Sequence, residues 1–180
     1  MKQNIFNRII IVACAFIALF FSACNEGMND EIQTNFFGVE FGASREEVVK
    51  AVQENGFKMN YSDDSYSSFV KENGSKISFG DMEWSFMSID FYNDRFNKIT
   101  FFSDDMKSKK DAEDEYNHRK WLIEKKYSLE DYSDGTGAIG KTKEGQYVRI
   151  YYSDRENYNH EKVFSVYLIY GDESIPQSDL

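Results

Sequence analysis

Residues 83–92, EWSFMSIDFY, alternate strictly between two kinds of side chain, and this constrains the fold more than any other feature. The apolar positions are Met87, Ile89 and Phe91. The other positions mix aromatic and polar side chains: Trp84, Phe86, Ser88, Asp90 and Tyr92. Successive side chains of a strand point to opposite faces, so this pattern predicts a strand with one face in a core. Turn residues at 93–94 then lead into residues 96–102, which predicts an antiparallel return strand.

Two helices and further strands are expected around this pair. Ser44 followed by Glu47 forms a capping box ahead of an apolar stripe, which predicts a helix of about eleven residues. Asn55-Gly56 ends that helix. A second helix is expected over residues 109–126, where apolar side chains recur every three to four positions. The other strand-like runs are residues 76–79, 137–142, 146–152 and 162–170.

The two halves of the chain show the same order of elements. Each runs helix, short irregular strand and two long aromatic strands, with Asp-Arg in the final turn at residues 94–95 and 154–155. This predicts an α+β fold of two helix-plus-antiparallel-meander units, a tandem repeat over 36–103 and 104–172. Two sheets each covered by a helix would satisfy the pattern, and so would one continuous sheet with both helices on one face.

The first residues have the composition of a secretory signal. Lys2 and Arg8 supply positive charge, and residues 9–21 contain no charged side chain. A helix of that length is about 20 Å long, shorter than the roughly 30 Å hydrocarbon core of a membrane. Residues 1–23 are therefore predicted to be a signal peptide and not a membrane-spanning helix.

Cys24 ends the sequence FSAC, which resembles the bacterial lipobox. The resemblance implies that Cys24 is acylated; ordinary cleavage, with Cys24 as a free thiol, is the alternative. Cys14 is removed with the signal, so acylation also explains the one unpaired cysteine of the mature chain. Asn25 resembles the sorting pattern for the outer membrane, on its periplasmic or surface side. The predicted segments are the signal peptide, a lipidated tether, the domain and a tail: residues 1–23, 24–35, 36–172 and 173–180.

The charge of the chain limits its partners. It carries 21 basic and 31 acidic side chains, and removal of Lys2 and Arg8 leaves 19 and 31, a net charge of −12. Such a surface repels phosphate groups, which excludes nucleic acid as a partner. It also repels an anionic membrane, so the lipid is expected to hold the protein there.

Catalytic and metal-binding sets are not expected. The two histidines, His118 and His160, lie among charged residues and are predicted to be solvated. The sequence lacks clustered His or Cys ligands for zinc, so we expect no metal and no cofactor. Adjacent acids such as Asp63-Asp64 would point apart on a strand, which makes a carboxylate-dependent hydrolase the weakest alternative.

Aromatic side chains are the feature that can carry function. Tyr and Trp on an exposed sheet face are favoured at partner interfaces. The even-numbered face of residues 83–92, and the matching face of residues 146–152, supply the candidate partner-binding residues: Trp84, Phe86, Tyr92, Tyr147 and Tyr151. The alternative is that the other half of the protein covers this face.

The segment FFGVEFGASREEVVKAVQENGF resembles the opening of small envelope lipoprotein domains of the BamE (SmpA/OmlA)-like and β-lactamase-inhibitor-protein-like type. The match rests on a helix start and its preceding glycines: Gly38, Gly42, Ser44, Glu47 and Val48. The resemblance implies a binding or scaffolding module and brings no catalytic residues with it. In BamE-type domains the helix ends in a Gly-x-Pro turn, whereas this chain has Gly56 without the proline.

The sequence therefore predicts a non-enzymatic, lipid-anchored envelope protein that binds another envelope protein or stabilises an assembly. An envelope glycan or other ligand is the first alternative, since sugars stack on aromatic rings.

Overall fold

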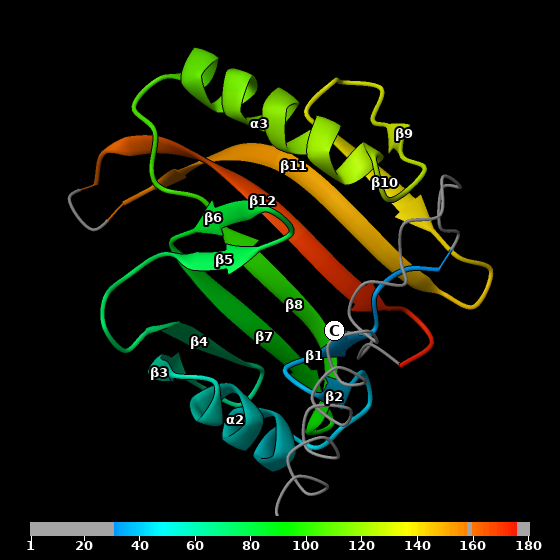
Figure 1. The fold of residues 1–180 in the computed structure, drawn as a ribbon. Coiled ribbons are helices and arrows are strands. Elements are labelled where there is room, and N and C mark those ends of the chain that lie inside the picture. The colour runs from blue at the N-terminus through cyan, green and yellow to red at the C-terminus, as the bar shows by residue number, and fades with distance from the viewer. Residues whose placement is uncertain (1–30, 158–159, 176–180) are drawn as a thin grey trace, which may run out of the picture.

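The computed structural model of the chain describes residues 31–157 and 160–175, and eight of their strands form one antiparallel sheet (Figure 1). The strands lie in the order β3-β4-β7-β8-β12-β11-β10-β9. Their bounds are β3 Phe57–Ser62, β4 Tyr66–Lys71, β7 Phe86–Tyr92, β8 Arg95–Phe102, β9 Glu130–Asp131, β10 Gly137–Lys141, β11 Gln146–Glu156 and β12 Lys162–Asp172. The longest strands, β11 and β12, are neighbours in this order, and β12 lies beside β8 at the centre of the sheet.

Two helices and two small hairpins complete the described fold. The helices are α2, Arg45–Glu54, and α3, Lys109–Glu124. The hairpins pair β1, Asn35–Phe36, with β2, Val39–Glu40, and β5, Ile77–Phe79, with β6, Met82–Trp84. The predicted capping box is confirmed, because the Ser44 amide donates to Glu47 Oε2 at 2.9 Å and the Glu47 amide donates to Ser44 Oγ.

One face of the sheet carries the core. α3 packs over β11 and β12, α2 packs near β3, and the β5–β6 hairpin lies between the two helices (Figure 1). Val48 and Val52 of α2 and Ile123 of α3 belong to a single buried cluster with sheet side chains such as Ile99 and Leu168. The odd-numbered positions predicted to face a core, at residues 87, 89 and 91, are all buried there.

The expectation of an α+β fold made of two helix-plus-antiparallel-meander units is wrong. The described chain is mostly β, with two helices against one eight-stranded sheet. β8 and β12 pair over five residues, from Phe102↔Tyr167 to Lys98↔Gly171, so hydrogen bonding runs without a break from one half into the other. Separate sheets would each leave an unpaired inner edge, and this pairing removes both edges. Residues 36–103 and 104–172 are therefore not two units.

The N-terminal predictions lie outside the described residues. These are the signal peptide over residues 1–23 and acylation at Cys24. Ile32 is 5% exposed and β1 begins at Asn35, so the packed part of the chain starts within the stretch assigned to the tether. None of the helices in the described ranges is long and apolar enough to cross a membrane.

Candidate functional site

The face of the sheet opposite the two helices is the candidate site, and we call it the open face. No helix or other strand of residues 31–157 and 160–175 packs over its centre. It consists of alternate residues of β7, β8, β12 and β11: Phe86, Ser88, Thr100, Phe102, Tyr167, Ile169, Tyr147, Arg149 and Tyr151. Tyr147, Tyr167 and Ile169 are at most 9% exposed, yet none of them belongs to the core cluster.

Four aromatic rings cross the open face in a line, one from each of four adjacent strands. We call this line the aromatic row: Phe86 of β7, Phe102 of β8, Tyr167 of β12 and Tyr151 of β11. Ring centroids are 4.1 Å apart for Phe86 and Phe102 and 4.6 Å for Tyr151 and Tyr167, and both pairs are stacked. The middle pair, Phe102 and Tyr167, meets edge to face at 5.3 Å. Register places these residues directly opposite one another, so the row is a property of strand pairing.

Two glycines within strands allow further rings to lie flat on this face. A methyl group added at Gly171 would lie 2.5 Å from the Tyr147 hydroxyl, and one added at Gly137 would lie 2.6 Å from the Tyr132 ring. Glycine within a strand weakens the strand, and it commonly marks a close approach of this kind. The rings of Tyr132 and Tyr147 therefore extend the aromatic surface on both sides of Arg149.

Burial extends the pH range over which the tyrosines of the open face stay protonated. It raises the pKa of Tyr147 to about 12, with the Glu173 carboxylate acting in the same direction. Burial also raises the pKa of Tyr151 and of Tyr167. A phenol with a raised pKa stays protonated at neutral pH, so these hydroxyl groups remain hydrogen-bond donors.

Two carboxylates on this side of the sheet are each paired with a cation. Asp90 binds Lys98 on the neighbouring strand. At the other end, Asp105 accepts from Arg155 Nη2 at 2.6 Å and from Ser165 Oγ at 3.2 Å. Since each carboxylate already has a cation, neither is positioned as a general base, and nothing here resembles the converging acids of a glycosidase.

Trp84 does not lie on the open face. It is 0% exposed, its indole Nε1 donates to the Phe79 carbonyl at 3.1 Å, and the Arg119 guanidinium lies 4.1 Å from its ring centroid. The strand predicted over residues 83–92 is interrupted at Ser85. On the N-terminal side of that break, β6 pairs with β5 and not with the main sheet, and this pairing directs the Trp84 side chain toward the core.

The other four predicted residues are distributed over one face. Phe86, Tyr147 and Tyr151, predicted from separate strands, lie together on the open face, because the second half of the chain extends this face and does not cover it. Tyr92 lies at the opposite end of β7 from Phe86, half-buried.

Sequence reasoning missed several residues of the site, among them Phe102, Tyr167 and Arg149. Each alternates with core residues in its strand, so the sequence indicated which face it lies on. The sequence did not indicate which strand lies beside it. β8 and β12 are separated by about sixty residues of sequence, and side-chain alternation carries no information about which strands pair. Gly137 and Gly171 were a usable signal of close approach.

A polar cluster of Lys76, Ser85 and Asp104 lies beside the β5–β6 hairpin. The Ser85 hydroxyl and the Lys76 ammonium both donate to Asp104 Oδ1, and these hydrogen bonds hold the pKa of Asp104 below its usual value. A serine nucleophile needs a neighbouring base. Here the lysine is engaged with an ionised carboxylate, so the arrangement is a structural ion pair.

In the described part of the chain, no group of three or more His, Cys, Asp or Glu side chains converges in a way that could hold a metal ion. His118 and His160 are exposed, as predicted. Asp134, in the turn between β9 and β10, accepts from the amide and the hydroxyl of Thr136.

Comparison with known protein families, curated proteins and solved structures finds no match to this chain. The resemblance to BamE-like and β-lactamase-inhibitor-protein-like domains therefore stays a prediction from the helix-start motif.

Proposed function

We propose that this chain is a non-enzymatic lipoprotein of the cell envelope whose open face binds another protein. The aromatic row carries the proposal, because four rings lie side by side on a sheet face that no described helix covers. Interfaces are enriched in aromatic residues and in arginine, and a few such side chains supply most of the binding free energy. The open face combines both residue types.

The geometry of the rings favours a protein over a glycan. Phe86 stacks on Phe102 with an interplanar angle of 9°, and Tyr151 stacks on Tyr167 at 7°. One face of each ring is therefore occupied by its neighbour. Sugar recognition by stacking needs free ring faces, whereas a protein surface can pack against the edges of such a row.

Site-specific photo-cross-linking in the cells that produce the protein tests this function. A photoreactive phenylalanine analogue at Phe86 or Tyr151 should form a discrete cross-linked protein band. The same analogue at Trp121, which is 54% exposed on α3, serves as the matched control. Bands from position 121 alone, or none from the open face, would refute the proposal.

We also propose that the chain is anchored to the outer membrane through acylation of Cys24, with the residues between Cys24 and the buried Ile32 as the tether. Cells expressing Cys24→Ala should lose radiolabelled palmitate from this protein and release it from their membranes. The thioether and amide-linked chains bury many methylene groups, each contributing about 0.8 kcal/mol, so their loss should abolish anchoring. Continued labelling of the variant would show that the lipid is attached elsewhere.

A further inference from the structure

Arg149 occupies an unusual position on the open face. It lies in β11 between Tyr147 and Tyr151, opposite Ile169 on one neighbouring strand and Ile139 on the other. Its guanidinium carbon is 4.6 Å from the Tyr151 ring centroid and 5.2 Å from that of Tyr132. Aromatic rings and aliphatic side chains thus surround the charge.

The guanidinium of Arg149 has no acidic partner among the residues that the structure describes. The other arginines of that part of the chain bind oxygen atoms: Arg45 binds Asp94, Arg119 binds Glu115, Arg155 binds Asp105, and Arg95 donates to the Gly42 carbonyl. Arg149 Nε is buried without any hydrogen-bond partner. Arg95 also lacks an acidic partner, but its guanidinium is bound to a carbonyl, whereas no oxygen atom of the described residues accepts a hydrogen bond from the Arg149 side chain.

Leaving such a group unpaired is unfavourable unless a ligand completes it. A buried N–H without an acceptor loses the hydrogen bonds that water would give it. Contacts with the Tyr132 and Tyr151 rings offset part of this cost through cation–π attraction. Nε is the atom that stays buried without an acceptor, and the planar N–H fork to which it belongs matches the two oxygens of a carboxylate.

We propose that Arg149, flanked by Tyr147 and Tyr151, binds an Asp or Glu carboxylate presented by the partner protein. The inference rests on the proposed function of the open face and adds the chemistry that the partner must supply. The aromatic row spans four strands, about 14 Å at the usual strand spacing, which is much wider than a single carboxylate. A polypeptide that covers the rings and places one acid on Arg149 fills both parts of the site.

The phenol groups reinforce this preference. Tyr147 and Tyr151 stay protonated at neutral pH and add neutral donors without adding negative charge. Two other cations on the strands of this part of the sheet, Lys98 and Lys141, are already bound to Asp90 and Glu173. An incoming acid therefore meets one uncommitted positive charge on this part of the face.

The test uses peptides selected from a random twelve-residue display library on the full mature, lipidated protein in detergent. Enriched peptides are synthesised, and their Kd values are measured by fluorescence polarisation for the wild type and for variants. We expect the peptides to carry an Asp or Glu whose change to Asn or Gln weakens binding at least tenfold. Arg149→Gln should weaken binding of the acidic peptide to the same extent. The two changes together should raise the Kd little more than either change alone.

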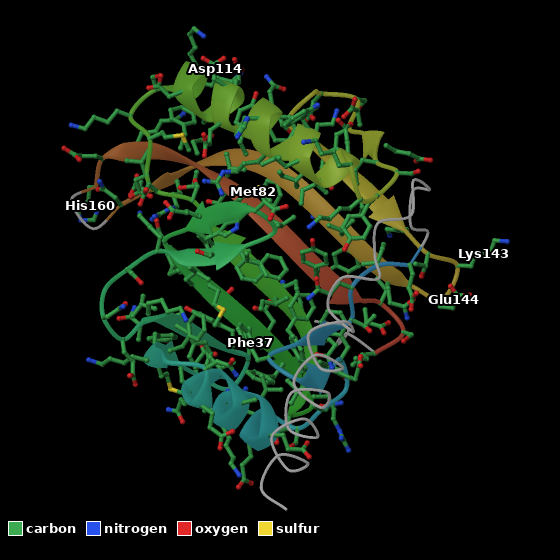
Figure 2. The ribbon with its side chains drawn as sticks, in the orientation of Figure 1. Phe37, Met82, Asp114, Lys143, Glu144 and His160 are labelled. Carbon is green, nitrogen blue, oxygen red and sulfur yellow. The ribbon has the colours of Figure 1, made fainter. Side chains whose placement is uncertain are left out.

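Two further variants make the result specific. Arg149→Lys keeps the charge but not the planar fork, so its affinity should fall between wild type and Arg149→Gln. Lys143→Gln removes the same charge from the β10–β11 turn, where Lys143 projects away from the sheet (Figure 2), and should leave Kd within about twofold. Circular dichroism melting of Arg149→Gln checks that its fold is retained.

Other outcomes separate the two proposals. If binding is lost on Tyr151→Ala but no acid couples to Arg149, the carboxylate inference fails and the protein-binding face stands. If neither Tyr151→Ala nor Arg149→Gln changes the Kd of any peptide, both proposals fail. If an oligogalacturonate binds the wild type more tightly than every selected peptide and depends on Arg149, the occupant is an acidic glycan and the inference is overturned.

Discussion

The two faces of the eight-stranded sheet arise from the same alternation of side chains along the strands, but one face is buried in the core and the other is open. On the covered face, Ile89, Ile99 and Leu168 are 0% exposed because α2, α3 and the β5–β6 hairpin lie over them. On the open face, within the described ranges, the rings pack on one another in the stacked pairs of the aromatic row and on Arg149, with no helix over them. Alternation along a strand therefore assigns each side chain to one face of the sheet, whereas elements from elsewhere in the chain determine whether that face becomes core or surface.

Trp84 and Phe86 show the difference within three residues. Both belong to the same side of a continuous strand in the sequence pattern, but one lies in the core and the other begins the aromatic row. The break at Ser85 separates them, since Ser85 donates its amide to the Phe102 carbonyl while β6 turns away to pair with β5. A single residue of irregular backbone thus assigns two aromatic side chains to different roles.

The largest expected effect is that of Trp84→Ala. Trp84 is among the largest fully buried side chains, and its replacement leaves a cavity beneath Arg119. We expect destabilisation by about 3–5 kcal/mol, as for other buried large aromatics. Urea unfolding followed by circular dichroism measures this change. A cost below about 1 kcal/mol would mean that the hairpin does not hold Trp84 in the core.

Much of the local structure was predictable, because local signals determine it. The capping box at Ser44 and Glu47, the apolar face of β7 and the start of α3 at Lys109 all follow from residues within one or two turns of each other. Ser108 accepts from the Asp111 amide, the same kind of N-terminal bond as at Ser44.

The fold class and half of the site were not predictable, for a common reason. The pairing of β8 with β12 joins residues about sixty positions apart, and the sequence pattern of each strand allows several neighbours. That pairing merges the two halves into one sheet and also places Tyr167 beside Phe102. An incorrect prediction of two units and a missed aromatic row therefore have the same cause.

The second-largest expected effect is a loss of unfolding free energy at high pH, to which a tyrosine on each side of the sheet contributes. Burial raises the pKa of Tyr116, on the covered face, and of Tyr147, on the open face, to about 12. An unfolded tyrosine titrates near 10, so the stability that each phenol contributes is present below pH 10 and is lost between about pH 10 and 12. Two pKa units correspond to at most about 2.7 kcal/mol for each group.

Tyr116→Phe and Tyr147→Phe separate these contributions. Each variant should lose less stability than the wild type between pH 9 and 11.5, as measured by urea unfolding at several pH values. If the open face is hydrated in the free protein, the change for Tyr147→Phe will be smaller than that for Tyr116→Phe. Equal changes would show that the rings exclude water from the open face as effectively as the helices exclude it from the covered face.

Among the changes to residues of the two sheet faces, Phe86→Ala has the smallest expected effect on stability, and it distinguishes an interface from a core. Phe86 is half-buried and stacked on Phe102, and such aromatic pairs contribute about 0.5–1.5 kcal/mol, so unfolding free energy should fall by about 1 kcal/mol. Capture of the partner should weaken by about 2 kcal/mol or more, because interface hot spots lose that much on truncation. Trp121→Ala removes a larger, exposed ring on α3, with Lys125 Nζ 3.4 Å from its centroid, and should change neither quantity by more than about 0.5 kcal/mol. Normal capture of the partner by a Phe86→Ala variant would show that the aromatic row does not bind the partner, whatever the melting temperature of the variant.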